Sequence, residues 1–128
     1  MRNMLKIIHN KLTYGEDLVL VTVIASSGAT PRGAGARMLV GKEGRICGTI
    51  GGGAVEYRSE QIAAKVLAEK TSLGHDFTLT KDDVQNLGMI CGGACNVFFH
   101  YIPAGDEHTI MLCEEAEAQF RKGNALWL

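Results

Sequence analysis

The spacing of apolar residues divides the chain into short helices and strands. Near the N-terminus apolar residues recur every three or four positions, which predicts an amphipathic helix over residues 2–13. Leu18–Ala25 is almost wholly apolar and rich in β-branched residues, so we expect a strand that is covered on both faces. After a polar, glycine-rich loop, two more strands are predicted over residues 36–40 and 45–50, joined by a hairpin turn at residues 42–44.

The second half of the chain continues with helices and strands in an irregular order. The pattern predicts a helix at about 53–70, a weak strand over 75–79 and a short helix from Thr80 to Gly88. A strand over 95–102 follows, and then a last helix with Asp106 as its N-cap and Gly123 as its C-cap. Without regular β-α-β alternation, this order favours an α+β fold: a single domain whose mixed, largely antiparallel sheet packs with three to four helices.

Composition and charge narrow the functional class. The chain has 128 residues, of which 46% are hydrophobic and 21% charged, as is typical of one soluble globular domain. The net charge of −1 argues against nucleic-acid binding, which requires a basic surface. No apolar run approaches the ~20 residues of a membrane span, and residues 1–12 do not resemble a signal peptide. We therefore expect a cytoplasmic protein whose four cysteines are reduced.

Two glycine clusters nearly repeat one another forty residues apart. Gly48–Ala54 and Gly88–Ala94 both read Gly-x-Ile-(Gly or Cys)-Gly-Gly-Ala. Glycine costs about 0.5–1 kcal/mol relative to alanine inside a regular element, so such clusters suggest positive φ angles or a close approach to the backbone. The clusters are interpreted as two walls of one small-molecule site. The alternative is two tight turns that are alike by chance.

The first cluster lies where a strand ends and a helix begins. The N–H groups of a helix N-terminus hold anions, and Gly51, Gly52 and Gly53 carry no side chains that would keep a phosphate away. The motif lacks the Lys-Ser/Thr of a P-loop, and Glu56 would repel an anion unless it points away. A helix dipole contributes roughly 0.3–1 kcal/mol, so other contacts must converge, and Arg32 in the earlier loop is a candidate. The alternative is a tight turn with a closely packed helix.

The second cluster places a thiol among glycines. Cys91 stands where Gly51 stands in the first cluster, beside Gly92 and Gly93. A thiol next to free N–H groups can act as a nucleophile or as a ligand for a metal, and the alternative is a small buried apolar side chain. The spacing of Cys91 and Cys95 is not that of a zinc site. No Ser-His-Asp set or carboxylate pair stands out, so no catalytic residue is assigned and enzymatic activity is left open.

At these motifs the sequence resembles the XdhC/CoxI family, accessory proteins of molybdenum hydroxylases such as xanthine dehydrogenase. The order and spacing of the runs together carry the resemblance, which covers most of residues 18–102. The matching runs are Leu20–Ser26 with Ala29–Arg32, Gly35–Val40, Gly48–Gly53 with Glu56, and Gly88–Gly93 with Val97.

The resemblance implies a chaperone that binds the molybdenum cofactor, as molybdopterin or its dinucleotide form, assists its sulfuration and hands it to the apo-enzyme. It implies that Arg32 and Gly51–Gly53 meet the anionic end of the cofactor, and that Cys91, with Gly92 and Gly93, faces the metal as a soft ligand. A cysteine desulfurase is a further expected partner, and a homo-oligomer is conceivable.

The chain departs from the family in three places. Ala54 stands where the family often has cysteine, and Asn96 stands where acidic or hydroxyl residues are common. Typical members add a C-terminal Rossmann-like domain, and residues 124–128 resemble the start of a connection to it. These departures keep two alternatives open: a small thiol-dependent redox or nucleotide-binding enzyme that uses Cys91, or a regulatory scaffold for the hydroxylase.

Overall fold

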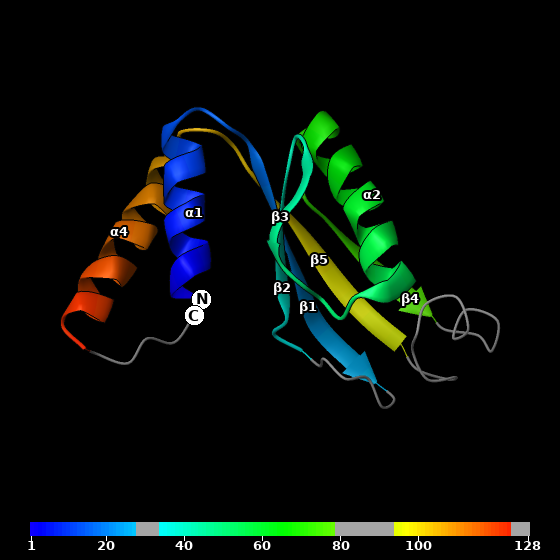
Figure 1. The fold of residues 1–128 in the computed structure, drawn as a ribbon. Coiled ribbons are helices and arrows are strands. Elements are labelled where there is room, and N and C mark those ends of the chain that lie inside the picture. Colours follow the sequence, from blue (N-terminus) through cyan, green and yellow to red (C-terminus); the bar gives the residue numbers. More distant parts are fainter. Residues whose placement is uncertain (28–33, 79–93, 124–128) are drawn as a thin grey trace. The chain divides into compact units, whose positions relative to one another are not determined.

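The computed structural model describes residues 1–27, 34–78 and 94–123 (Figure 1). The helices and strands in these ranges are α1 (Arg2–Thr13), β1 (Leu18–Ser27), β2 (Arg37–Gly41), β3 (Gly44–Gly48), α2 (Gly53–Glu69), β4 (Leu73–Thr78), β5 (Ala94–Ile102) and α4 (Glu107–Arg121). The predicted α+β class is confirmed, as are the helices expected at 2–13 and 53–70. The short helix predicted from Thr80 to Gly88 lies outside the described residues.

The five strands form one sheet in the order β3-β2-β1-β5-β4. Strands β1 and β2, β2 and β3, and β4 and β5 pair antiparallel, and Figure 1 shows β1 and β5 running in opposite directions. The turn predicted at residues 42–44 joins β2 and β3 as a hairpin, with Gly41 paired to Gly44. The pairing of β1 with β5 is the long-range step, because it joins the first strand to the last.

Helix α2 lies along one face of this sheet (Figure 1). Alternate residues of the strands point to this face, as the two-residue period of a strand requires. The buried cluster on this side is made of Val19, Val21, Val23, Met38, Val40, Ile50, Val55, Ala63, Val66, Phe77, Cys95, Val97 and Phe99. The strand predicted to be covered on both faces is exposed at one point of the opposite face, because Ile24 is 54% exposed while Val23 beside it is buried.

The boundaries of β3 and β4 differ from the sequence prediction, whereas α2 ends where expected. Strand β3 ends at Gly48 and not at residue 50, because Gly48 adopts φ 79° and turns the chain out of the sheet. Strand β4 begins at Leu73, two residues before the expected start of the strand at residue 75. Lys70, at φ 58° and ψ 39°, ends α2 in the left-handed conformation that commonly closes helices.

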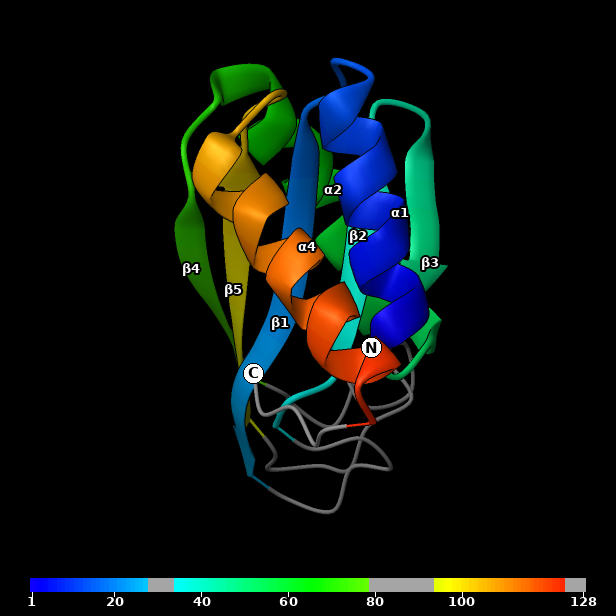
Figure 2. The same cartoon turned by 90° about the vertical axis from the view of Figure 1, so that its left-hand side faces the viewer.

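The chain divides into two compact units, Val19–Tyr101 and a helical unit made of Met1–Leu18 with Ile102–Leu128. In the helical unit α1 and α4 lie side by side (Figure 2). The predicted N-cap of α4 is confirmed, since the Asp106 carboxylate accepts a hydrogen bond from the Thr109 N–H at 3.1 Å. No helix among the described residues combines the length and the apolar character needed to cross a membrane.

Candidate functional site

Residues Gly48–Gly53, here called the glycine loop, connect β3 to α2. Four of its glycines adopt positive φ: 79° at Gly48, 129° at Gly51, 76° at Gly52 and 65° at Gly53. Positive φ angles are unfavourable for other residues, because their Cβ atom clashes with the backbone, whereas glycine adopts them readily. The positive φ angles expected from the glycine cluster are therefore confirmed, and the run of glycines is required by the path of the backbone.

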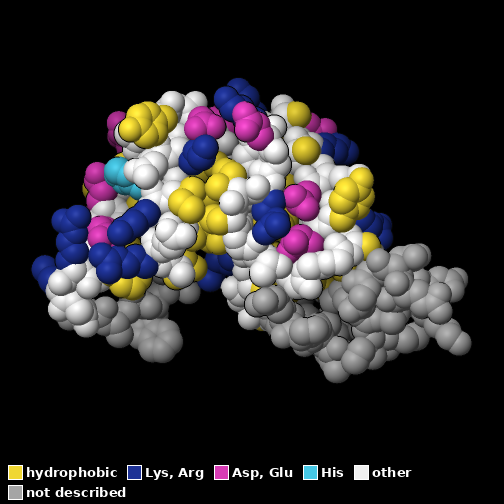
Figure 3. Space-filling model, viewed as in Figure 1, with side chains coloured by type: hydrophobic (Ala, Val, Ile, Leu, Met, Phe, Trp, Pro, Cys, Tyr) yellow, Lys and Arg dark blue, Asp and Glu magenta, His cyan; other side chains and the backbone are white. Residues whose placement is uncertain are grey.

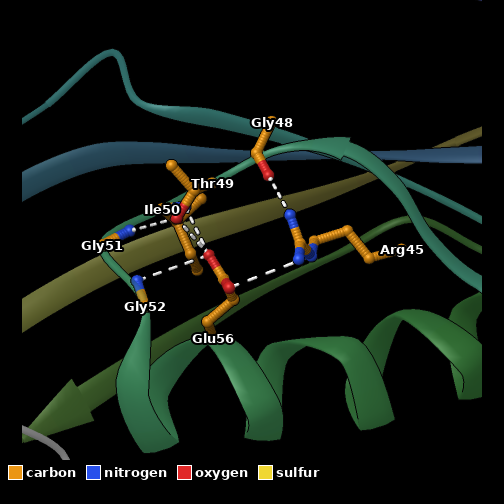
Figure 4. Close-up of polar contacts among 7 residues, drawn as sticks. All are labelled: Arg45, Gly48, Thr49, Ile50, Gly51, Gly52 and Glu56. Atoms are coloured by element: carbon orange, nitrogen blue, oxygen red, sulfur yellow. Dashed lines mark hydrogen bonds and ion pairs between the residues drawn. The ribbon is translucent and has the colours of Figure 1, made fainter.

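The carboxylate of Glu56, in the first turns of α2, points back into the glycine loop (Figure 4). Its Oε1 accepts hydrogen bonds from the Ile50 N–H at 3.0 Å and the Gly52 N–H at 3.4 Å. The same oxygen accepts a hydrogen bond from the Thr49 hydroxyl. One oxygen thus holds three donors from the loop.

Thr49 and Arg45 extend this network to both sides. The Thr49 Oγ1 accepts a hydrogen bond from the Gly51 N–H at 3.1 Å. The Arg45 Nε lies 3.9 Å from the second carboxylate oxygen of Glu56, and its Nη1 donates to the Gly48 carbonyl at 2.9 Å. The end of β3, the loop and the start of α2 are therefore tied together by side chains.

The hydrogen bonds keep the Glu56 carboxylate ionised. Partial burial by itself raises its pKa, but the hydrogen bonds from Thr49, Ile50 and Gly52 act in the opposite direction. The positive charge of Arg45 adds to them, and the net result is a pKa below the usual value for glutamate. The negative charge inside the loop is thus present at neutral pH.

This geometry refines the anion site expected at the start of α2. The N–H groups of Ile50, Gly51 and Gly52 already have acceptors within the protein. The N–H groups of the first helical turn, beginning with Gly53, have no acceptor inside the helix itself. The condition set from the sequence, that Glu56 points away, is not met: its carboxylate points into the loop and is paired there with loop donors.

The structure shows the contacts of Ala54 and Asn96, two residues at which the chain departs from the resembled family. Ala54 is half-buried and packs against the core cluster, in the first turn of α2. The Asn96 side chain donates a hydrogen bond to the carboxylate of Asp76, its cross-strand partner. An acidic residue at position 96 would face Asp76 with like charge, which destabilises a strand pair.

The other predicted site residues are Arg32, Cys91, Gly92 and Gly93, and they lie outside the described residues. Whether the two glycine clusters face one another therefore stays a prediction. Among the described cysteines, Cys47 is half-buried, and Cys95 and Cys113 are buried. Burial raises the pKa of all three thiols, more than the nearby positive charge of Arg45 lowers that of Cys47. Within the described ranges no group of three or more His, Cys, Asp or Glu side chains could hold a metal ion.

A groove of about 480 Å³ lies between α1 and α4 in the helical unit. Its lining includes Leu5, Lys6 and His9 from α1, and Cys113, Glu114 and Arg121 from α4. Charges of both signs surround it, and the view in Figure 3 shows basic side chains next to acidic ones over these helices. Their pairing is direct, as in the 2.7 Å ion pair of Arg2 with Glu117, so the groove shows no excess of one charge that would select a ligand.

The sequence pattern assigned no role to Thr49 and Arg45, and it gave Glu56 as a residue of the resembled motif and as a source of repulsion, not as a partner of the loop. In a capping box the acidic residue follows the N-cap hydroxyl residue by three positions and reaches back to its N–H group. Thr49 and Glu56 are seven positions apart, and the N-cap of α2 is Gly52. The sequence therefore carried no standard spacing that would have identified this contact.

The chain is similar to known proteins over a segment that includes the glycine loop. The profile of the XdhC and CoxI family matches residues 12–78, which include the glycine loop and Glu56. The chain is 34% identical over 85 residues to a probable xanthine dehydrogenase subunit of Bacillus subtilis (strain 168), covering 66% of this chain and 25% of that protein. It is 30% identical over 102 residues to the molybdenum cofactor insertion chaperone PaoD of Escherichia coli (strain K12), covering 77% and 31%.

Two further proteins extend the comparison. An uncharacterized protein of Escherichia coli (strain K12), YqeB, is 35% identical over 79 residues, which are 62% of this chain and 14% of that protein. The fold matches that of a crystal structure of a xanthine dehydrogenase from Bacillus halodurans, with a TM-score of 0.75 and 23% identity over 91% of this chain and 35% of that one. The chain thus spans between 14% and 35% of the length of these proteins. Because the family profile matches more than half of its residues, the chain belongs to the XdhC and CoxI family.

Proposed function

We propose that this protein binds the molybdenum cofactor, protects it, and assists its sulfuration and insertion into a molybdenum hydroxylase. The family match over residues 12–78 carries the proposal, because it includes the glycine loop. The name of PaoD, a molybdenum cofactor insertion chaperone, and that of the Bacillus subtilis relative support the same role.

The described part of the site suits a flat, anionic ligand. Gly51 and Gly53 are exposed, and the position of a side chain on Gly52 is open space, so a ligand can reach the backbone there. The N–H groups of the first turn of α2 offer donors to a phosphate. Cys91 would supply a soft donor toward molybdenum or a transferable sulfur, with Gly92 and Gly93 beside it, and Arg32 would pair with the phosphate.

The partners follow from the same role. We propose that the apo-enzyme of a molybdenum hydroxylase receives the cofactor and that a cysteine desulfurase supplies the sulfur. A homo-oligomer and a cytoplasmic location remain predictions of the sequence.

Retention of molybdenum tests the proposal. The purified chain is incubated without oxygen with molybdenum cofactor released from a hydroxylase, passed through a desalting column and assayed for molybdenum by mass spectrometry. We expect the wild-type chain to retain the metal, Cys91→Ser to retain much less, and Cys47→Ser, which removes a half-buried thiol, to match the wild type.

The two ways in which this retention test can fail lead to different conclusions. If the wild-type chain retains no molybdenum, the chaperone role is wrong, and the scaffold alternative is tested by capture of the apo-hydroxylase. If Cys91→Ser unfolds the protein, Cys91 is a packing residue. In that case Ala54→Cys, which places a thiol at the position where the family often has one, tests whether a thiol at the loop improves retention.

A further inference from the structure

We propose that Glu56 is a positioning residue, whose carboxylate sets the shape of the glycine loop that contacts the cofactor. The inference rests on the proposed function and adds a residue that holds the binding surface without contacting the ligand. It is carried by the contacts of Glu56 with the loop and with Arg45.

The glycine loop requires such a residue because its glycine backbone has little intrinsic preference for any one conformation. Glycine has the largest conformational freedom of any residue, and the loop contains four, all at positive φ. Gly52, at φ 76° and ψ −168°, adopts a conformation that is essentially restricted to glycine. Hydrogen bonds from Thr49, Ile50 and Gly52 to one carboxylate oxygen select this conformation from the many that the glycines allow.

The same contacts decide which side of the loop meets a ligand. The N–H groups of Ile50 and Gly52 are directed to Glu56, and that of Gly51 is directed to Thr49. The exposed backbone of Gly51 and Gly53 is left on the outside. Glu56 therefore presents a bare backbone surface and withholds the inner N–H groups from solvent anions.

The charge arrangement explains how a carboxylate can lie beside a site for an anionic ligand. The Glu56 side chain is 13% exposed, whereas that of Arg45, 3.9 Å away, is 46% exposed. The Glu56 carboxylate is thus largely buried and paired with a cation that is more exposed than it is. This placement lowers the repulsion expected from an acidic residue next to the start of α2.

Two substitutions test the role of Glu56, each with a matched control. Glu56→Gln removes the charge at nearly the same size, and Glu69→Gln makes the same change at an exposed position on the same helix. Thr49→Val removes one donor, and Thr49→Ser keeps the hydroxyl. The affinity of each variant of the 128-residue chain for molybdenum cofactor is measured by equilibrium dialysis, with molybdenum quantified on both sides. Hydrogen exchange is measured for the peptide that contains residues 48–56.

In Glu56→Gln and Thr49→Val we expect the amide hydrogens of the loop to exchange with solvent at least about tenfold faster than in the wild type. We also expect both variants to bind the cofactor about tenfold more weakly, which is a change of about 1.4 kcal/mol in the free energy of binding. Glu69→Gln and Thr49→Ser should match the wild type in both measurements. If Glu56→Gln does not fold, the two Thr49 variants decide.

The outcomes separate this inference from the proposed function. Folded Glu56→Gln and Thr49→Val variants with wild-type affinity would overturn the positioning role while the chaperone role stands. If the wild-type chain binds no cofactor, the chaperone role fails and the positioning role fails with it. Loop exchange that is unchanged in both variants would overturn the inference even where the affinity falls.

Discussion

At the scale of single residues, backbone conformation explains Gly52 better than any contact of a side chain. An added Cβ on Gly52 would meet nothing within 4 Å, and the same is true of Gly74 on β4. The two positions differ in φ, which is positive only at Gly52. They therefore form a natural pair for separating conformational cost from steric clash.

Gly52→Ala is expected to lower the free energy of unfolding by about 1–3 kcal/mol, because alanine must adopt a conformation that only glycine tolerates. Gly74→Ala is expected to leave stability unchanged or to raise it by about 0.5–1 kcal/mol, because alanine has less freedom to lose on folding. Urea unfolding of both variants checks this. Equal effects of the two substitutions would show that backbone conformation does not govern the glycine loop.

Ser59 is the buried polar residue of the α2 face that packs on the sheet. It is 0% exposed, and its hydroxyl has no hydrogen-bond partner among the described residues. Because an unpaired buried hydroxyl costs about 1–3 kcal/mol, Ser59→Ala should not lower the free energy of unfolding and should raise it by up to about 1 kcal/mol. The reverse change at the fully buried Ala63, Ala63→Ser, should lower it. A clear loss of stability in Ser59→Ala would reveal a partner of this hydroxyl.

Glu56 also gives the fold a specific dependence on acid. Its pKa is lower in the folded protein than in the unfolded chain, so the ionised carboxylate stabilises the fold at neutral pH. This contribution is fully present above the pKa of the unfolded chain and is lost as the pH falls through the lower pKa of the folded state. The urea midpoint of Glu56→Gln should therefore fall less steeply with acid than that of the wild type or of Glu69→Gln. If the urea midpoints of Glu56→Gln and the wild type fall equally steeply with acid, the stabilising role of the ionised Glu56 carboxylate is contradicted.

At the scale of elements, the helical unit of α1 and α4 contains both a fully buried apolar side chain and an exposed ion pair. Leu12 is 0% exposed, whereas the Arg2 side chain that bonds to Glu117 is 47% exposed. The Glu117 carboxylate accepts hydrogen bonds from Arg2 at 2.7 and 3.1 Å, which lower its pKa, and solvent screens this pair. We therefore expect the buried apolar side chain to contribute more to the stability of the protein than the exposed ion pair does.

Leu12→Ala is expected to destabilise the protein by about 2–5 kcal/mol, through lost burial and the cavity that it leaves. Glu117→Gln should have a much smaller effect, and added salt should reduce it further. Thermal unfolding at low and high salt measures both. An effect of Glu117→Gln as large as that of Leu12→Ala would show that the ion pair carries the helix contact.

At the scale of the whole molecule, the chain divides into two units, and each contains a buried cysteine. Cys113 belongs to the helical unit, and Cys95 belongs to the core of Val19–Tyr101. Cys47, on β3, is only half-buried. These thiols report separately on the two units.

Alkylation by a maleimide, followed by peptide mass spectrometry, should label Cys47 faster than Cys95 and Cys113 in the intact chain. Deletion of residues 1–13 removes α1 and should expose Cys113, while Cys95 stays protected by its own core. Equal loss of protection at both thiols would mean that the two units unfold as one.

Much of the architecture could be predicted because it depends on neighbours in the sequence. The stripe of α1, the Asp106 cap and the hairpin of β2 and β3 follow from apolar spacing and turn residues. The positive φ angles of the glycine loop follow from steric limits on all other residues. The family could also be identified, because its motifs are local runs.

The tertiary structure decided what depends on residues far apart in the chain or on the direction of a side chain. The pairing of β1 with β5 sets the strand order, and no local pattern specifies it. The exposure of Ile24 could not be predicted, because an apolar residue does not show whether another element covers it. The role of Glu56 depended on the fold of the glycines before it: only when the loop turns its N–H groups inward does a residue expected to repel a ligand become the acceptor that holds the loop.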